Sequence, residues 1–373
     1  MQRRQWLVGL LALAFAAASG SAPSAAQQKY GAPGEPIKLA VGYQPYYTES
    51  WSGVVINGLQ LWKKYLPPGS EVEFQVGLQG AVIVGQLLAD KQQIGYMGDM
   101  PALVATNRSD VADIRLVAVL GTSEQQCNIF LVRSDAPAFE TPAEFLKWLD
   151  GKVVASPHGS CTDRFAQAVF RKNGVKPAEY LNQNIEVIST NFKVKKLDAA
   201  VIWEPTASKL VAEGTARRVA SGVDFHEGDA GFLGMRHDLM EQRPDVVRGW
   251  LEAELDAQIF LADPRNADAV AKMAEAQTTG MSKKTLWMSL YGDYARDSGG
   301  DAIKESLPFI FAPAALQLAQ NAHQFLFEMK RVSTGPIRTG AIDDAIARQV
   351  LADRHMESPV GVVKALPESD YRE

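Results

Sequence analysis

The stretch Ile94-Gly95-Tyr96-Met97-Gly98-Asp99-Met100-Pro101 predicts a short strand that turns at once into a helix. Gly98 and Asp99 form the tight turn between them. Pro101 suits the first helical turn, where its missing N–H needs no partner. In an open α/β sheet, ligands bind beyond the carboxyl ends of the strands. We therefore expect this turn to face a binding site.

The alternation of strand and helix continues on both sides of this stretch. We expect strands over 37–42, 71–77, 93–96, 115–120 and 128–133, and helices over 52–65, 81–89 and 100–107. A second, similar unit has predicted helices over 142–149 and 161–173 and strands over 152–156, 185–188 and 199–203. From about Leu233 the chain is predicted to be mainly helical, over 244–261, 267–275, 283–289 and 313–330. This alternation is typical of a mostly parallel sheet with helices on both faces.

Length and composition fit a globular protein of about two domains. The chain has 373 residues, and 46% of them are hydrophobic, which is enough apolar material for two ordinary cores. The net charge is -5, with no basic tail, so we expect no nucleic-acid partner. A mildly acidic protein can still bind an anion, because the local field at the site decides.

The first residues have the pattern of a secretory signal. Arg3 and Arg4 precede an apolar run over 6–18, and Ser24-Ala25-Ala26 fits the small-residue cleavage rule. The run is shorter than the roughly 20 residues that span a bilayer. We expect a signal peptide over 1–26, cleaved after about Ala26, a flexible leader over 27–35, and export to the periplasm. No cysteine lies near the cleavage site, which argues against a lipid anchor.

Four predicted strands are followed by glycine-containing turns that lead into helices. These turns lie at 42–47, 79–81, 98–101 and 157–162. Such turns direct free backbone N–H groups and the positive ends of helix dipoles to one place, which creates an anion site without cationic side chains. Few Lys or Arg residues lie near them, so a small oxyanion fits better than a phosphate ester in a P-loop.

Each candidate residue also has an ordinary structural interpretation. Asp99, Ser160 and Thr162 could simply cap helices, and Trp203 could belong to the core. Tyr43, Tyr46, Tyr47 and Trp51 are dense for one loop, so we expect at least one of them in the pocket, whereas His158 is more typical of a structural role.

The two cysteines, Cys127 and Cys161, suit a disulfide in an oxidising compartment, but their separation in sequence leaves the pairing open. Two cysteines and 5 His are too few and too scattered for a zinc site, and we expect no metal and no cofactor.

Several segments together resemble one family. These are Val41-Gly42-Tyr43-Gln44, the 94–101 stretch, Gly151-Lys152-Val153-Val154-Ala155 with Gly159-Ser160, and Leu197-Asp198-Ala199-Ala200-Val201-Ile202-Trp203-Glu204-Pro205. In this order they resemble the nitrate/sulfonate/taurine group of ABC-importer binding proteins. The resemblance implies the α/β type II periplasmic-binding fold, with two lobes joined by two crossover strands and a ligand between them. It also implies the ligand-facing residues Tyr43, Gln44, Gln79, Gly80, Asp99, Ser160, Cys161, Thr162, Trp203 and Glu204.

The two α/β units and the double crossover assign 36–125 and 229–373 to lobe one and 126–228 to lobe two. Two departures from the family pattern stand out. The segment 188–197 looks too short for the helix that the family has there, and Cys161 stands where a small hydroxyl residue is common.

The sequence thus predicts a periplasmic solute-binding protein that works as a monomer with a permease of the inner membrane. Its solute would be a small anion of the sulfonate or taurine type, with the oxyanion at Ser160 and Thr162. Nitrate, an aromatic carboxylate or a thiamine pyrimidine precursor stay open as cargo, as does a sensory role. An enzyme on this fold is not expected, because no Gly-x-Ser-x-Gly elbow or nucleophile–base spacing is present.

Overall fold

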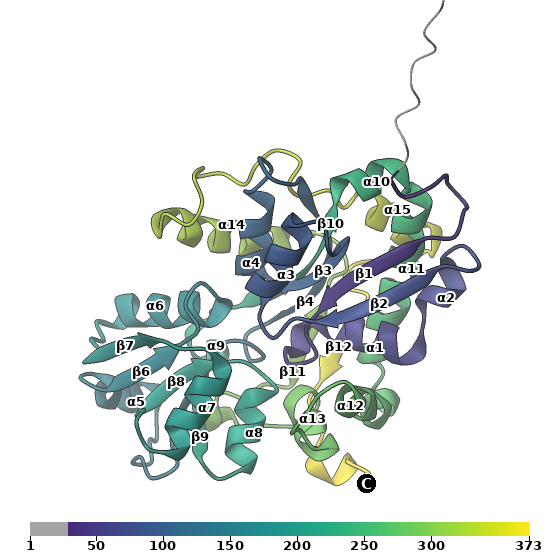
Figure 1. The fold of residues 1–373 in the computed structure, drawn as a ribbon. Coiled ribbons are helices and arrows are strands. Elements are labelled where there is room, and N and C mark those ends of the chain that lie inside the picture. Colours follow the sequence, from purple (N-terminus) through teal and green to yellow (C-terminus); the bar gives the residue numbers. More distant parts are fainter. Residues whose placement is uncertain (1–28) are drawn as a thin grey trace, which may run out of the picture.

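The computed structural model describes residues 29–373 and consists of two lobes, each built around its own β-sheet (Figure 1). Lobe one contains a seven-stranded sheet in the order β12 (Gly361–Lys364), β11 (Ile303–Leu307), β4 (Ile114–Ser123), β10 (Asp229–Arg236), β3 (Ile94–Gly98), β1 (Lys38–Tyr43), β2 (Glu71–Val76). Lobe two contains a five-stranded sheet in the order β7 (Glu179–Asn182), β6 (Val153–Ser156), β8 (Ala199–Ile202), β5 (Ile129–Arg133), β9 (Ala216–Ser221).

Both sheets are mixed, so the prediction of mostly parallel sheets was wrong. β1 pairs in parallel with β2 and β3, and β6 pairs in parallel with β7 and β8. The two strands that enter from the other lobe, β10 and β5, run opposite to their neighbours in the sheet. β10 is antiparallel to both β3 and β4, and β5 is antiparallel to both β8 and β9. A crossover strand enters its sheet from the far lobe, which reverses its direction.

Helices cover both faces of each sheet. Those of lobe one are α1 (Trp51–Leu59), α2 (Trp62–Tyr65), α3 (Gly80–Leu88), α4 (Asp99–Thr106), α10 (His237–Gln242), α11 (Pro244–Ala262), α12 (Ala267–Ala276), α13 (Lys283–Leu290), α14 (Pro313–Glu328) and α15 (Ala345–Asp353). Those of lobe two are α5 (Pro142–Leu149), α6 (Cys161–Asn173), α7 (Ile185–Lys193), α8 (Thr206–Ala212) and α9 (Gly222–Phe225). Short 3-10 helices lie at η1 (Thr48–Ser50), η2 (Pro264–Asn266), η3 (Arg296–Ser298) and η4 (Glu368–Asp370).

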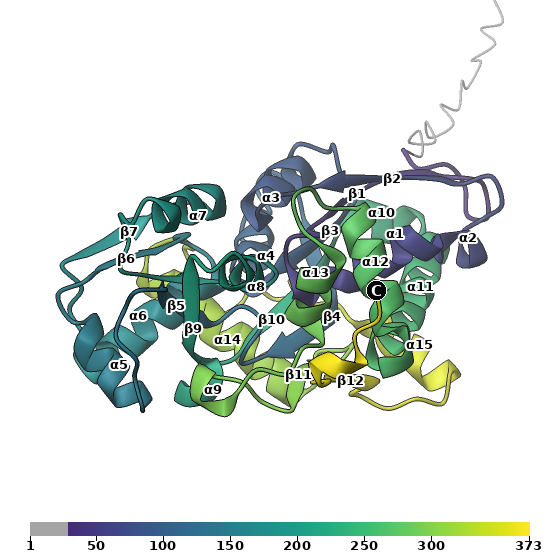
Figure 2. The same ribbon diagram turned by 90° about the horizontal axis from the view of Figure 1, so that it is seen from below.

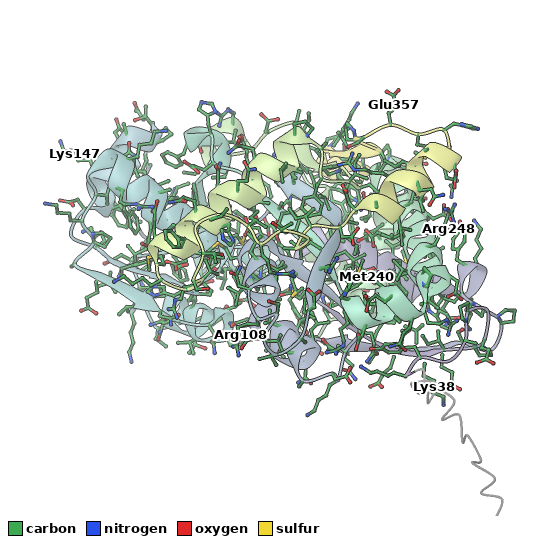
Figure 3. All side chains as sticks on the ribbon, turned by 90° about the horizontal axis from the view of Figure 1, so that it is seen from above. Lys38, Arg108, Lys147, Met240, Arg248 and Glu357 are labelled. Atoms are coloured by element: carbon green, nitrogen blue, oxygen red, sulfur yellow. A yellow bond between two sulfur atoms is a disulfide. The ribbon has the colours of Figure 1, made fainter. Side chains whose placement is uncertain are left out.

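The cores follow the two-residue period of the strands. In β5, Phe130 and Val132 point into one core of lobe two, and Ile129 and Leu131 point into the other. All four are fully buried, as expected for a central strand covered on both faces. Charged side chains such as Arg108 and Lys147 lie on the outside of the lobes (Figure 3).

Two local predictions were wrong. The segment 185–188, predicted as a strand, begins the helix α7, because the side chain of Asn184 accepts a hydrogen bond from Val187 N–H and Ile188 and Phe192 share one buried face. The segment 188–197 therefore does contain a helix, contrary to expectation. The region after Leu233, predicted to be helical, starts inside the strand β10. This strand lies between β3 and β4 in the sheet, and its side chains are buried on both faces.

The predicted signal peptide, 1–26, lies outside the described residues. The leader over 27–35, predicted to be flexible, is instead held against lobe one from Lys29 on. Arg243 is fully buried and donates to the carbonyl oxygens of Tyr30 and Glu35 at 2.8 and 2.7 Å. Lys29 forms ion pairs with Asp90 and Asp238.

The chain passes between the sheets after β4 and again before β10, and the two lobes lie side by side (Figure 2). Part of the C-terminal region also contacts lobe two, since Arg218 of β9 donates to the carbonyl oxygens of Ser298 and Gly299. The exact lobe boundaries stay a prediction. Over residues 29–373, no helix is both long and apolar enough to cross a membrane.

Candidate functional site

A small cavity lies between the lobes, at the point where several helices begin. Its volume is about 30 Å³, room for only a few atoms. Lobe one and the segments next to it contribute Gln44, Tyr47, Gly80, Gly98 and Pro101, and lobe two contributes Ser160, Cys161 and Trp203.

Lobe two presents the start of α6 to this cavity. Ser160 is the N-cap residue, with extended backbone angles, and its hydroxyl accepts a hydrogen bond from Asp163 N–H. The N–H groups of Cys161 and Thr162, at the first two helical positions, have no carbonyl within the helix to bond. These donors and the positive end of a helix of 13 residues suit the negative charge of a bound oxyanion.

The hydroxyls at this helix start are already engaged. Ser160 Oγ donates to Pro157 O at 2.5 Å and lies 2.7 Å from Thr162 Oγ1, which in turn lies 3.0 Å from Ser156 Oγ. Thr162 is fully buried. The two hydroxyls therefore order the turn, and the backbone N–H groups are the donors best placed for a ligand.

Lobe one presents the starts of α3 and α4 to the same cavity. Gly80 is the first residue of α3, and a Cβ atom there would lie 2.4 Å from Pro101 Cγ. Only glycine lets the two helix starts come this close. Gly98 is the N-cap residue of α4, so backbone groups rather than long side chains form this wall.

Asp99, next to Gly98, pairs with the opposite lobe. Its Oδ2 atom lies 2.8 Å from Arg164 Nη2, and its Oδ1 atom accepts a hydrogen bond from Met100 N–H at 2.6 Å. Arg164 also donates to Gly228 O at 3.0 Å. Burial raises the pKa of the Asp99 carboxyl, and the positive charge of Arg164 opposes that shift. The carboxylate is thus occupied by the protein itself.

Trp203 and Glu204 bring lobe two against the loop after β1. Trp203 Nε1 donates to Tyr46 O at 2.9 Å, and its ring meets Tyr47 edge-on at 6.4 Å. Glu204 points away from the cavity, because its carboxylate pairs with Arg218 at 3.2 Å and accepts from Ser208 N–H. Trp203 is therefore both a wall of the cavity and an interlobe contact.

A buried carboxyl pair lies behind Tyr47. The Tyr47 hydroxyl donates to Glu49 and lies 3.4 Å from Asp229 Oδ2. Burial raises the pKa of Asp229 to about 7, and burial together with the nearby Asp229 raises the pKa of Glu49. The two carboxyls both lie at the Tyr47 hydroxyl, and each acts on the pKa of the other.

Cys127 and Cys161 form a disulfide with Cα atoms 6.5 Å apart, which resolves the alternative that the sequence left open. Cys127 lies in the crossover between β4 and β5, and Cys161 is the first residue of α6. The bridge therefore fixes the cavity-facing end of α6 to the connection between the lobes.

The structure brings together five of the ten residues predicted to face the ligand: Gln44, Gly80, Ser160, Cys161 and Trp203. The other five do not line the cavity: Tyr43 packs edge-on against Phe74, Gln79 is the N-cap residue of α3, and Asp99, Thr162 and Glu204 bond within the protein.

Three residues that line the cavity were not among those predicted to face the ligand: Tyr47, Gly98 and Pro101. Tyr47 belongs to the aromatic-rich loop, and the other two belong to the 98–101 turn. Asp229 behind the wall was also not predicted, and the sequence gives no signal for it.

Comparisons with known proteins agree on the type of protein. The model of the NMT1-like family matches residues 32–275. The taurine-binding periplasmic protein of Escherichia coli K12 is 25% identical over 295 residues, which cover 75% of this chain and 83% of that protein.

Two solved binding proteins share the fold, which confirms the predicted type II periplasmic-binding architecture. The nitrate-binding protein NrtA of Synechocystis PCC 6803 has a TM-score of 0.67 and 17% identity, covering 88% of this chain and 93% of NrtA. The alkanesulfonate-binding protein SsuA of Xanthomonas axonopodis pv. citri has a TM-score of 0.64 and 19% identity, covering 83% of this chain and 99% of SsuA. The desulfurization enzyme DszB shares the fold too, with a TM-score of 0.60, so the fold alone does not separate binding from catalysis.

Proposed function

Because this chain belongs to the NMT1-like family, we propose that it is an exported solute-binding protein that captures a small sulfonate between its lobes. In this role it delivers the sulfonate from the periplasm to the permease of an ABC importer. The relative named as a taurine-binding periplasmic protein supports both the location and the class of solute.

The observation that carries this proposal is the convergence of helix starts on one interlobe cavity. The first residues of α3 and α6 and the N-cap residue of α4 line it together. Their free N–H groups and dipoles favour a group that carries negative charge on several oxygens. A sulfonate has three such oxygens and no proton to lose near neutral pH.

The size of the cavity favours a small head group over a ring. About 30 Å³ accommodates a sulfonate or nitrate group more readily than an aromatic carboxylate or a pyrimidine. Trp203 and Tyr47 enclose the space from the sides and suit the short alkyl chain of a sulfonate better than the fully polar nitrate ion.

The chemistry of the wall favours binding over catalysis. The Ser160 hydroxyl bonds Pro157 O and Thr162 Oγ1, and neither is a base that could activate it as a nucleophile. Cys161 is held in a disulfide and offers no thiolate.

A thermal-shift screen of the mature protein tests the proposal. We expect short alkanesulfonates, including 2-aminoethanesulfonate, to raise stability by about 2.7 kcal/mol at a hundredfold excess over Kd, whereas aromatic carboxylates and pyrimidines leave it unchanged. Stabilisation by one of those rings and by no sulfonate would refute the choice of solute. An uptake assay in cells that lack the gene separates transport from sensing, since only a transport role predicts lost uptake.

A further inference from the structure

The disulfide lies in the wall of the cavity, where the two lobes meet. Cys161 lines the cavity, and it packs with Cys127, Tyr47 and Trp203 in one small apolar cluster. Tyr47 comes from the loop after β1 in lobe one, whereas Trp203 follows β8 in lobe two. A change in the bridge therefore acts directly on the binding site.

The Cys127 end of the bridge is held firmly. Cys127 is fully buried in the crossover between β4 and β5, and side chains on both sides of it bond backbone groups elsewhere in the chain. Gln125 donates to Ile303 O at 2.8 Å, and Asn128 donates to Glu227 O at 2.8 Å. The crossover is therefore a fixed anchor for the segment that the bridge ties to it.

The Cys161 end of the bridge is the part of α6 that carries the N–H groups for the oxyanion. In the turn before it, Ser160 Oγ donates to Pro157 O, a bond that stays inside lobe two. Gly159 in this turn has open space around it, with no atom within 4 Å of the place where a Cβ would lie. The disulfide thus ties a turn that has room to move to a crossover that has none.

Such a tie raises affinity by holding the binding groups in place before the solute arrives. A disulfide that keeps a binding segment in its bound conformation reduces the freedom that the segment loses on binding. Phe165, Ala166 and Val169 of α6 pack into the core of lobe two, so α6 keeps its helix without the bridge. Opening the bridge should therefore loosen the oxyanion site rather than unfold the lobe.

The route to the bridge leads through the cavity. Cys127 has an exposed fraction of 0% and Cys161 one of 5%, and Cys161 lines the cavity. The cavity, at about 30 Å³, is too small for a dithiol, so the lobes must separate before a reductant attacks. A solute held by both walls opposes that separation and thereby shields the bridge.

We propose that the Cys127–Cys161 disulfide controls solute capture according to its redox state. The oxidised protein binds the sulfonate tightly, a dithiol reductant that opens the bridge weakens binding, and a bound sulfonate protects the bridge from reduction. This inference rests on the proposed function and adds the regulation of the same site.

The reduction is a two-step thiol–disulfide exchange. One thiolate of the dithiol attacks Cys161 Sγ and forms a mixed disulfide, while the bond to Cys127 breaks and the Cys127 sulfur takes up a proton. The second thiolate of the reductant then attacks the mixed disulfide, which releases Cys161 as a thiolate that is protonated in turn. Two electrons and two protons thus pass to the protein, and the dithiol leaves as a cyclic disulfide.

Binding and reduction are linked by thermodynamics. If opening the bridge weakens binding by a given factor, saturating solute must disfavour reduction by the same factor. We expect a factor of about ten, the scale of ordering one binding segment. For a two-electron couple this factor corresponds to a shift of about 30 mV in the midpoint potential.

The first test measures both sides of this linkage on the mature protein. Titration calorimetry with 2-aminoethanesulfonate should give an affinity about tenfold higher for oxidised protein than for protein kept reduced with dithiothreitol. Thiol quantification in dithiothreitol redox buffers should give a midpoint potential about 30 mV more negative at saturating 2-aminoethanesulfonate than without it. Equal affinities, or tighter binding by the reduced form, overturn the inference and leave the proposed function intact, whereas binding by neither form removes the proposed function itself.

Cys127→Ala separates the effect of the bridge from that of the cavity wall. This variant removes the bridge and keeps Cys161 at the wall. It should bind 2-aminoethanesulfonate about tenfold more weakly than the oxidised wild-type protein, with the same affinity in the presence and absence of dithiothreitol. If dithiothreitol weakens binding by this variant as much as by the wild-type protein, the effect belongs to the reagent and the inference is wrong.

The rate of reduction tests the route to the bridge without relying on the reduced protein. Thiol release from native oxidised protein should slow about a hundredfold when 2-aminoethanesulfonate is at a hundredfold excess over Kd, because only the unliganded fraction reacts. Sodium chloride at the same ionic strength is the control and should leave the rate unchanged.

Urea distinguishes this route from reduction after unfolding. Reduction through global unfolding would accelerate with urea as steeply as unfolding itself, whereas access by lobe separation gives a weaker dependence. A rate that the solute does not change, or one with the full urea dependence of unfolding, contradicts access through the cavity. If the reduced protein does not fold, these rates decide alone.

Discussion

Arg164 Nη2 in α6 lies 2.8 Å from Asp99 Oδ2 at the start of α4, so an ion pair with exposed fractions of 5% and 0% joins the two lobes beside the cavity. Both partners belong to helices whose first turns line the cavity. A separation of the lobes would therefore return both charges to water. The pair couples the position of lobe two to the binding site.

The first prediction concerns this interlobe pair. Arg164→Met leaves Asp99 buried without its partner in the closed form, which typically costs about 3–5 kcal/mol. Because each lobe keeps its own core, we expect closure and ligand affinity to suffer more than folding. X-ray scattering should give a larger radius of gyration at saturating ligand than for the wild-type protein, and calorimetry an affinity at least tenfold weaker.

Arg171→Met is the matched control for that prediction. Arg171 lies in the same helix and also reaches across to the other lobe, but its pair with Glu328 is about half exposed and such pairs contribute little. Wild-type affinity and radius in Arg164→Met would show that the buried pair does not hold the lobes together.

The second prediction concerns the approach of α3 to α4. Gly80→Ala places a Cβ atom 2.4 Å from Pro101 Cγ, which forces the two helix starts apart at the cavity wall. We expect a loss of affinity of at least tenfold with the fold retained, measured by calorimetry and circular dichroism. Gly85→Ala in the same helix meets no atom within 4 Å and should bind normally; equal affinities in the two variants would contradict this account of the wall.

The third prediction concerns the disulfide. Cys127 and Cys161 are separated by 34 residues, and a bridge that closes a loop of this length stabilises by about 3–4 kcal/mol in the chain-entropy model. The double variant with serine at both positions should lose this amount in urea denaturation. Thiol titration of native, non-reduced protein should find no free thiol, and two reactive thiols would count against the bridge.

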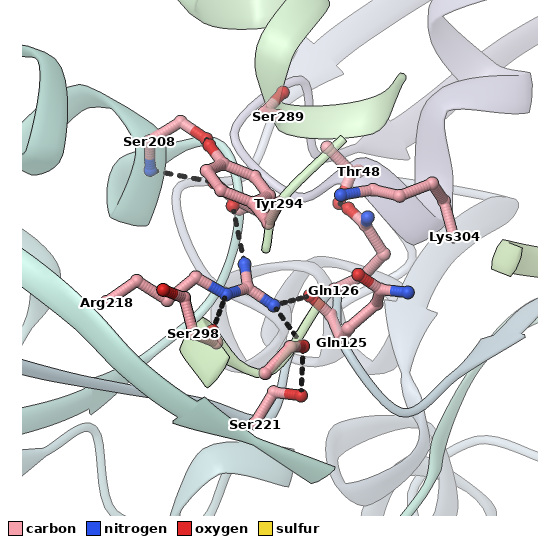
Figure 4. Close-up of polar contacts among 12 residues, drawn as sticks. Thr48, Gln125, Gln126, Ser208, Arg218, Ser221, Ser289, Tyr294, Ser298 and Lys304 are labelled. Carbon is pink, nitrogen blue, oxygen red and sulfur yellow. Dashed lines mark hydrogen bonds and ion pairs between the residues drawn. The ribbon is translucent and has the colours of Figure 1, made fainter. Parts of the chain in front are cut away.

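The fourth prediction concerns Lys304, which lies in the polar cluster between the lobes (Figure 4). It is 1% exposed, and its Nζ atom lies 4.6 Å from the centre of the Tyr294 ring without a hydrogen-bond partner in the described chain. Burial lowers the pKa of Lys304 to about 7; the charge of Arg218 lowers it further, and Glu204 opposes the shift. The unfolded chain keeps the ordinary pKa of about 10.4.

The sign of the pH dependence follows from these two values. Between pH 7 and pH 10 the unfolded chain binds more protons at Lys304 than the folded one, so this group makes stability rise with pH. Lys304→Met should be about 1–4 kcal/mol more stable at pH 7, and its advantage should shrink by pH 9. Urea denaturation at both pH values measures this, and a variant less stable than wild type at pH 7 would disprove it.

The sequence predicted best those elements whose local signals agree with their packing. The helix over 161–173 has a serine cap and a terminal glycine, and the structure places α6 at those residues. The segment 185–188 was predicted wrongly because Ile-Glu-Val-Ile also fits a strand, and Phe192, which shares the buried face of the helix with Ile188, lies beyond this segment. β10 was missed in part because Gly231 and Gly234 weaken a strand pattern, although they allow close packing against Glu49 and Met97.

The candidate site was predictable where the backbone provides it and not where tertiary pairing decides. The turns at 98–101 and 157–162 predicted helix starts, and residues of both turns line the cavity. Asp99 and Glu204 were predicted to face the ligand, because no sequence pattern shows that their carboxylates form ion pairs with Arg164 and Arg218. Asp229 lies 180 residues away from Glu49 in the sequence, so their pairing appears only in the folded chain.

A crystal structure of the mature protein grown with 2-aminoethanesulfonate tests the central claim most directly. The account predicts electron density for the sulfonate between the lobes, with its oxygens at the N–H groups of Cys161 and Thr162 and its carbon chain between Tyr47 and Trp203. A saturated crystal in which this cavity is empty, or in which the sulfonate binds elsewhere on the protein, would contradict it.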